Sequence, residues 1–215
     1  MPWRVIYIFQ KASCWLGLSM SSFVLLLLLA FGIGGQSLVH ILRAMNNNVK
    51  LICFYGPEST GKSTMAKQMA AYYQTEFVPE VAREIVSSND FSLNDIVRIA
   101  KAQNERVKEK MKTANKLLFC DTDLITTQIY CRHYLKTVPV ILYELEKEIK
   151  YDQYFLFDID VPWVADGLRD LGTKRMEMFQ TFEMELSNRK ICYQLVTGTW
   201  GDREKAITKR LDMLF

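Results

Sequence analysis

The chain has 215 residues, of which 49% are hydrophobic and 24% are charged, and its formal net charge is +3 at pH 7. This composition excludes a largely disordered protein, and the small net charge gives no indication of a nucleic-acid partner. The 5 cysteines include no C-x-x-C pair, so they predict buried, reduced thiols and no zinc site.

A hydrophobic leader is set apart at the amino terminus, over residues 1–44. Residues 14–42 contain no Asp, Glu, Lys or Arg, so this segment reaches the roughly 20 residues that a bilayer-crossing helix needs. Three interpretations stay open: a membrane anchor, a cleaved export signal, or translation from a start codon upstream of Met45. Basic residues flank the segment on both sides and leave the orientation of an anchor undefined.

Residues 45–215 are expected to form one domain in which strands and helices alternate. A long helix is expected to open at an N-cap on Ser92, with Asp95 three residues on, and its apolar period continues to Met111. The other expected helices cover residues 62–73, 81–86, 124–134, 138–149, 173–189 and 202–214. The expected strands cover residues 49–55, 75–78, 116–120, the apolar half of 154–160, and 191–196. This alternation predicts a parallel, doubly wound α/β sheet with helices on both faces.

The stretch FYGPESTGKST, residues 54–64, fits the pattern G-x-x-x-x-G-K-[ST] between an apolar strand and an amphipathic helix. Glycines let successive backbone N–H groups point into one hollow, and the helix adds its positive end. The pattern predicts a polyphosphate site; the alternative is a chance match on a surface turn. Lys62 would reach the β- and γ-phosphate oxygens, and the Ser63 hydroxyl would bind Mg²⁺. The predicted nucleotide-binding residues are Gly56, Pro57, Glu58, Ser59, Thr60, Gly61, Lys62, Ser63 and Thr64.

Two carboxylates follow the predicted strand KLLFC, in the order Asp-Thr-Asp. A phosphate loop of this kind needs a carboxylate at the end of a neighbouring strand to hold the magnesium ion. Asp121 stands where the strand ends and is the expected metal partner, whereas Asp123 is expected to face the acceptor substrate. The alternative interpretation of the pair is a solvated turn or a helix cap.

Two further segments carry charged and aromatic residues that fit a ligand site. PEVARE places Glu80, Arg83 and Glu84 just after the second strand, near the edge at which open α/β sheets bind ligands. PWVADGLRDLG places Trp163 and Arg169 in one loop, the composition of a lid that brings a cation to a transferring phosphoryl group. The alternatives are a solvated helix face, a core tryptophan and a surface ion pair.

From Met45 onward the chain resembles the ribosylnicotinamide kinase domain of NadR-type NAD-biosynthesis proteins and related stand-alone P-loop ATPases. The resemblance rests on GPESTGKST, PEVARE, IAKAQ, FCDTDLITTQIYC and PWVADGLRDLG, and on the arginine of WGDREKAITKRL. It implies a nucleoside-kinase-like fold with a short lid. It also implies ATP and Mg²⁺ as cofactors, and transfer of the γ-phosphoryl group to the 5′-hydroxyl of nicotinamide riboside, which gives nicotinamide mononucleotide.

The resemblance further implies a role for each matched residue. Arg203 would lie against the adenine. One departure concerns the pyridine ring: riboside kinases of the family carry aromatic residues just before the Arg-Glu pair, where this chain has Pro79 and Val81. The implied catalytic residues are Lys62, Asp123 and Arg169, the implied metal ligands are Ser63 and Asp121, and the implied acceptor-binding residues are Glu80, Arg83, Glu84, Asp123 and Trp163.

Other function classes stay open beside the riboside kinase. They are a regulatory switch that binds ATP or GTP, a kinase for another nucleoside, and a membrane-tethered ATPase that depends on the leader. The expected partner is a small-molecule acceptor and no nucleic acid, and the oligomeric state is left open. The catalytic domain is expected in the cytoplasm, because ATP is scarce outside it, with residues 14–42 as an optional anchor.

Overall fold

The computed structural model describes residues 49–165 and 169–214 of the chain. The predicted leader, residues 1–44, lies outside these ranges, as do residues 166–168 of the predicted lid loop. Nowhere in the two ranges does a helix combine the length and the apolar character that crossing a membrane requires.

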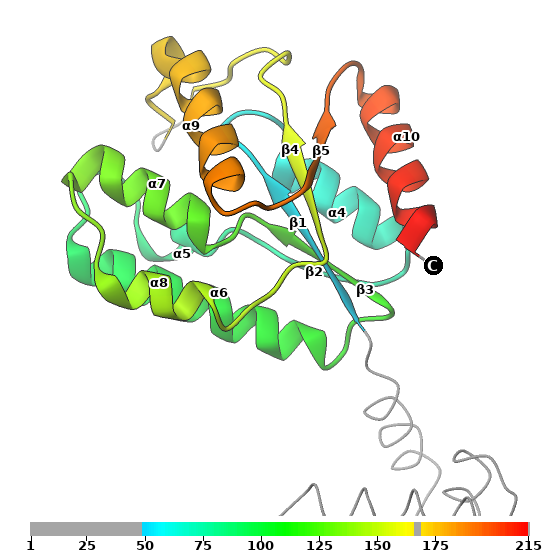
Figure 1. Ribbon diagram of the computed structural model, residues 1–215, viewed down its shortest axis with the longest axis horizontal. Coiled ribbons are helices and arrows are strands. Elements are labelled where there is room, and N and C mark those ends of the chain that lie inside the picture. Colours follow the sequence, from blue (N-terminus) through cyan, green and yellow to red (C-terminus); the bar gives the residue numbers. More distant parts are fainter. Residues whose placement is uncertain (1–48, 166–168, 215) are drawn as a thin grey trace, which may run out of the picture. The chain divides into compact units, whose positions relative to one another are not determined.

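The described part of the chain folds around one sheet of five parallel strands (Figure 1). The strands are β1 (Lys50–Tyr55), β2 (Glu76–Val78), β3 (Leu117–Asp121), β4 (Gln153–Phe157) and β5 (Tyr193–Val196). The α-helices are α4 (Lys62–Tyr72), α5 (Ala82–Ile85), α6 (Leu93–Met111), α7 (Leu124–Leu135), α8 (Val140–Glu146), α9 (Arg175–Asn188) and α10 (Trp200–Leu211). Short 3₁₀ helices cover Gly172–Lys174 and Asp212–Leu214.

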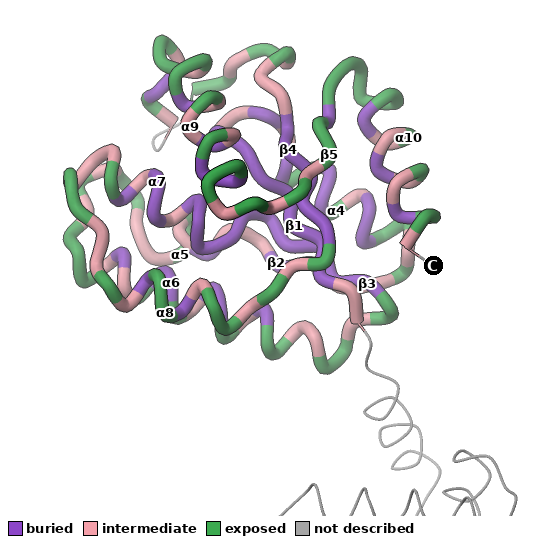
Figure 2. Tube along the Cα trace, viewed as in Figure 1, coloured by how far each residue is buried: buried purple, intermediate pink, exposed green. Residues whose placement is uncertain are grey.

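The two faces of the sheet are covered by different helices because β1 sends alternate side chains to opposite sides. Ile52 and Phe54 pack in one core cluster with side chains of α4 and α10. Cys53 and Tyr55 pack in a second cluster with side chains of α7 and α9. Figure 2 shows the central strands β1, β3 and β4 buried and the outward sides of the helices exposed. The predicted doubly wound α/β fold with helices on both faces is therefore confirmed.

Local capping sets where the long helices begin. Ser92 and Asp95 form a capping box at the start of α6, as the sequence predicts. A second capping box, between Thr199 and Asp202, starts α10 at Trp200, two residues before the predicted start. Asp202 occupies the third position of that helix, where its carboxylate accepts from the Thr199 backbone N–H. The predicted boundary was wrong because it treated this residue as the first of the helix.

The strand order places the ends of β1 and β3 together. The order is β2-β3-β1-β4-β5, so the chain leaves β1 toward one side of the sheet and later returns to β4 on the other. Phe54 of β1 pairs in register with Asp121 of β3, so both strands end at the same level. Ligands of open α/β sheets bind in the crevice at such a reversal of strand order. The glycine turn after β1 and the carboxylate that ends β3 meet there.

Candidate active site

The turn between β1 and α4, residues 56–61, has a backbone that only glycine accommodates at its two ends. Gly56 has a φ of +135°, and a Cβ atom there would lie 2.9 Å from the Phe157 carbonyl oxygen. Gly61 has a φ of +86°, and a Cβ atom there would lie 2.9 Å from the Trp200 ring. A side chain at either position would be strained. The turn is thus shaped as a loop whose N–H groups, with the amino end of α4, can surround an anion.

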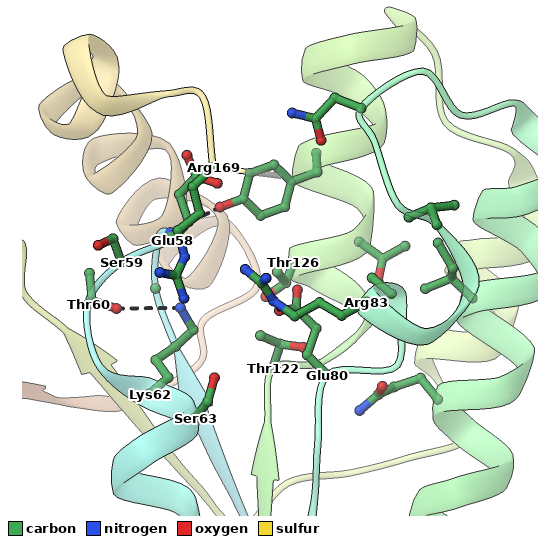
Figure 3. A pocket seen from close by; sticks show the side chains of 18 of the residues that line it. Glu58, Ser59, Thr60, Lys62, Ser63, Glu80, Arg83, Thr122, Thr126 and Arg169 are labelled. Atoms are coloured by element: carbon green, nitrogen blue, oxygen red, sulfur yellow. Dashed lines mark hydrogen bonds and ion pairs between the residues drawn. The ribbon is translucent and has the colours of Figure 1, made fainter. Parts of the chain in front are cut away.

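The Lys62 ammonium group folds back over this loop. Its Nζ atom donates to the Pro57 carbonyl oxygen at 2.6 Å and to Thr60 Oγ1 at 3.4 Å. Figure 3 draws the contact between Lys62 and Thr60. Burial lowers the pKa of Lys62, and the nearby Asp121 carboxylate opposes that shift. These two oxygens hold the ammonium group within the turn that the sequence motif predicts to bind phosphates.

Asp121 is the last residue of β3 and lies close to Ser63 and Lys62, behind the residues that line the pocket itself. Its side chain is 1% exposed, accepts a hydrogen bond from Ser63, and has an Oδ1 atom without a hydrogen-bond partner. Burial raises the pKa of Asp121 to about 6, while Lys62 acts to lower it. A buried carboxylate oxygen without a partner, beside a hydroxyl, is a donor set that fits Mg²⁺.

No group of three or more His, Cys, Asp or Glu side chains within the described residues could hold a metal ion without other ligands. A magnesium ion at Ser63 and Asp121 would therefore take its remaining ligands from phosphate oxygens and water.

The phosphate loop is one end of a large pocket (Figure 3). The pocket encloses roughly 1120 Å³ of space, part of which is open to solvent. Glu80 and Arg83, an ion pair at 3.4 Å, project into it from the side opposite Lys62. Further wall residues come from the segment after β2, from α6, and from the stretch that runs from the end of β3 into α7: Ala82, Val86, Asn89, Phe91, Ile96, Ile99, Gln103, Thr122, Thr126, Thr127, Tyr130 and Tyr134.

Three aromatic rings of this wall were missed by the sequence reasoning. Phe91 and Tyr134 pack edge to face with centroids 5.4 Å apart, and Tyr130 stacks near Tyr134 at 6.5 Å. The Tyr130 hydroxyl also accepts a hydrogen bond of 3.1 Å from the Glu58 backbone N–H of the phosphate loop. The spacing of four residues between the two tyrosines, just after the Asp-Thr-Asp segment, was the available signal. The aromatic rings of the pocket wall thus lie on other elements than the segment of Pro79 and Val81, where the resemblance leads one to expect them.

The segment after β4 is tied to the phosphate loop by side chains of the loop itself. The Leu171 N–H donates to Glu58 Oε1 at 2.9 Å, and the Val164 N–H donates to Ser59 Oγ at 2.8 Å. Burial raises the pKa of Glu58. Arg169 lines the pocket and donates to the Val164 carbonyl oxygen at 3.4 Å. The predicted lid segment therefore lies against the loop and brings a cation to the pocket.

Arg175, at the start of α9, is a further residue that the sequence reasoning missed. Its guanidinium group donates to the Val161 carbonyl oxygen at 2.9 Å and to the Ser59 carbonyl oxygen at 3.4 Å. The same group lies 5.7 Å from the centre of the Trp163 ring. Arg175 thus links the lid segment, through Val161, to the phosphate loop, through Ser59. No pattern in the sequence distinguishes this residue from other helix arginines.

Asp123 does not line the large pocket. It is 3% exposed and is the N-cap of α7, where Oδ1 accepts from the Thr126 N–H at 3.0 Å. Its Oδ2 atom accepts from the Tyr154 hydroxyl at 2.9 Å. Burial raises the pKa of Asp123 to about 6. The expectation that this carboxylate faces the acceptor is corrected: it is the helix cap of the alternative interpretation.

Arg203 also lies elsewhere than expected. Its side chain is fully buried, and its guanidinium group donates to the Thr60 carbonyl oxygen at 2.9 Å and to the Gly198 carbonyl oxygen at 3.1 Å. It also pairs with Asp160. The group supports the phosphate loop through Thr60, and because its side chain is fully buried and packs 5.7 Å from the centre of the Phe157 ring, it is not accessible to an adenine ring in this structure.

Glu84 and Trp163 are likewise placed outside the pocket wall. Glu84 is half exposed and pairs through both carboxylate oxygens with Arg106 of α6, the solvated helix face of the alternative interpretation. Trp163 packs its ring against Gly172 and beneath Arg175. The predicted residues that do line the pocket are Gly56, Glu58, Ser59, Thr60, Gly61, Lys62, Ser63, Thr64, Glu80, Arg83 and Arg169.

Two curated relatives are similar in sequence to this chain. The chain is 32% identical over 145 residues to the trifunctional NAD biosynthesis/regulator protein NadR of Salmonella typhimurium. The aligned residues make up 64% of this chain and 35% of that protein. It is 34% identical over 131 residues to the NadR protein of Escherichia coli, and these residues make up 58% of this chain and 32% of that protein. The chain thus spans about a third of the length of these relatives. The resemblance to NadR-type proteins is confirmed.

Solved structures share the fold. A NadR protein in complex with NR superposes with a TM-score of 0.68 at 20% identity, covering 79% of this chain and 53% of that one. A deoxyadenosine kinase from M. mycoides superposes with a TM-score of 0.57 at 13% identity, covering 76% of this chain and 99% of that one. These superpositions confirm the predicted nucleoside-kinase-like α/β fold of this chain. A family model described as an AAA domain matches residues 51–203, so the chain belongs to that family of P-loop proteins.

Proposed function

We propose that this protein is an ATP-dependent kinase that phosphorylates the 5′-hydroxyl of nicotinamide riboside and so forms nicotinamide mononucleotide. The observation that carries the proposal is the continuity of one pocket from Lys62 to Tyr134. A phosphate loop at one end fits a nucleoside triphosphate, and a wall of aromatic and apolar side chains at the other end fits a flat ring. The similarity to NadR relatives supports the choice of nicotinamide riboside as the acceptor.

The phosphate end supplies positive charge where a phosphoryl group would be transferred. Lys62 neutralises charge on the β- and γ-phosphate oxygens, and Arg169 reaches the same pocket from the lid segment. Ser63 and Asp121 would hold Mg²⁺, which when bound neutralises the phosphate oxygens. Phosphoryl transfer needs mainly positioning and charge stabilisation, so no strong base is required of the protein.

Glu80 takes the acceptor role that Asp123 was expected to have. The Glu80 carboxylate lines the pocket beside Arg83, whereas Asp123 is closed off as a helix cap. In this proposal Glu80 accepts from the 5′-hydroxyl group and orients it toward the phosphoryl group. Glu84 and Trp163 have no part in binding the acceptor.

The test is an acceptor panel assayed with the full chain, ATP and Mg²⁺. The panel holds nicotinamide riboside, adenosine, cytidine, thymidine and deoxyadenosine, and products are identified by mass spectrometry. The proposal expects nicotinamide mononucleotide as the main product. Turnover of another nucleoside, with none of nicotinamide riboside, would overturn the choice of acceptor and retain a kinase.

A further inference from the structure

Gln103 is a buried polar residue in the apolar part of the pocket wall. It lies on α6, is 3% exposed, and lines the pocket together with Ile96 and Ile99. These residues are spaced by three and four positions, so they share one face of the helix. The other polar groups that bind or support the nucleotide in the proposal belong to the opposite, phosphate end. Among the described residues, Gln103 makes no hydrogen bond to the phosphate loop.

The orientation of the Gln103 amide is fixed by the backbone. Its Oε1 atom accepts a hydrogen bond of 3.1 Å from the Val81 N–H, at the N-cap of α5. A backbone N–H can only donate, so the oxygen and not the nitrogen of the amide must face Val81. The Nε2 group consequently points away from α5 with both of its hydrogens unused by that contact.

The Nε2 atom is buried and has no hydrogen-bond partner among the described residues. Buried N–H donors in folded proteins nearly always have a partner, so this one indicates an acceptor that is not part of the chain. Since the oxygen is already occupied, the residue offers the pocket a donor and no acceptor. A sugar hydroxyl is better served by the mixed donor and acceptor pair of Arg83 and Glu80.

We propose that Gln103 donates a hydrogen bond to a carbonyl oxygen on the ring of the acceptor, and so selects bases that carry one. This inference rests on the proposed function, because it names the part of the acceptor that the pocket recognises. For nicotinamide riboside the accepting atom is the oxygen of the carboxamide group. An acceptor that lacks this oxygen leaves Nε2 buried and unpaired, which makes its binding less favourable.

The experiment compares two acceptors that differ only at this group: nicotinamide riboside and the pyridinium riboside without the carboxamide. Each is assayed for kcat/KM, and for binding by calorimetry, with the full-length chain and with Gln103→Met. The wild-type chain should prefer the carboxamide by about 10-fold or more. In Gln103→Met the preference should fall to about 3-fold or less, and only the carboxamide substrate should lose efficiency.

A purely structural role would give a different pattern. Loss of packing or of the Val81 contact would lower the efficiency of both ribosides equally, and that result would overturn the inference. A second variant, Gln103→Glu assayed at pH 8, retains an oxygen for Val81 and replaces the donor by a carboxylate. It should lose the carboxamide preference at least as fully as Gln103→Met.

Failure of the inference and failure of the proposed function have different signatures. Equal turnover of the two ribosides by the wild-type chain contradicts the role of Gln103 and leaves the kinase proposal standing. Binding that depends on Gln103 and on the carboxamide, without turnover, contradicts the kinase proposal and supports the role of Gln103. Absence of both binding and turnover contradicts both.

Discussion

At the phosphate end of the pocket, one continuous segment, residues 56–64, supplies most of the lining, whereas the far end is assembled from three separate elements. The conformation of the phosphate loop is set by its backbone at Gly56 and Gly61. It is also stabilised by the hydrogen bond from Arg203 to the Thr60 carbonyl oxygen. The far end depends on how α6 and α7 pack against each other. The phosphate end is therefore a local and rigid structure, whereas the far end can be altered by substitutions that leave the fold intact.

The largest expected effect is at the phosphate end. Lys62→Ala should lower kcat on the order of 10²-fold or more, because it removes the ammonium group that neutralises phosphate oxygens in the transition state. The matched control is Lys67→Ala, an exposed lysine on the same helix. Steady-state kinetics with ATP and nicotinamide riboside would measure both. Near-normal turnover of Lys62→Ala would contradict the assignment of the phosphate loop.

Asp121→Asn should combine a loss of activity with a gain in stability. Turnover should fall about 10-fold or more, with a higher Mg²⁺ requirement, because the carboxylate that would hold the metal is gone.

The pKa of Asp121 is raised from 3.8 to about 6 by burial, so the folded state binds this proton more tightly than the unfolded state does. The ionised carboxylate therefore destabilises the fold above pH 6, and this cost is lost as the pH falls from 6 toward 4.

Thermal unfolding without Mg²⁺ tests the stability half of this prediction. At pH 8 the Asp121→Asn variant should unfold a few degrees above the wild-type chain, and the gap should shrink as the pH is lowered through about 6. A lower unfolding temperature for the variant at pH 8 would show that the carboxylate stabilises the fold, contrary to the raised pKa.

A smaller effect is expected at the junction between the loop and the lid segment. Arg175→Ala removes the hydrogen bonds to the carbonyl oxygens of Val161 and Ser59. Kinetics should show kcat/KM reduced by about 10-fold, because the loop and the lid lose their shared support. Arg98→Ala, a largely exposed arginine on α6, is the control. Equal activity of Arg175→Ala and the control would exclude a positioning role for Arg175.

The smallest effect is expected for a hydroxyl group at the far end. Tyr134→Phe removes the hydrogen bond to Asp170 but keeps the ring that packs on Phe91. The KM for the riboside should change by about 3-fold or less, while Tyr134→Ala should raise it by about 10-fold. If Tyr134→Phe were as damaging as Tyr134→Ala, the hydroxyl and not the ring would be the group that matters.

The same contrast explains what could be predicted from the sequence. The fold followed from the alternation of apolar strands and amphipathic helices, and the phosphate loop followed from a motif whose residues are adjacent in the chain. The aromatic wall at the far end was missed because Phe91 precedes α6 whereas Tyr130 and Tyr134 lie on α7, so the three rings meet only in the folded chain. The roles expected of Asp123 and Arg203 failed for a related reason: hydrogen bonds to Tyr154 and to loop carbonyl groups decide where those side chains lie.

The most direct test of a pocket that joins a donor and an acceptor is the fate of the γ-phosphoryl group. The full chain would be incubated with ATP labelled in the γ-phosphate, Mg²⁺ and nicotinamide riboside, and the labelled products separated. Label in nicotinamide mononucleotide, formed on the order of 10²-fold or more slowly by Lys62→Ala, is the predicted result. Label found only in inorganic phosphate, at the same rate with and without the riboside, would contradict the account.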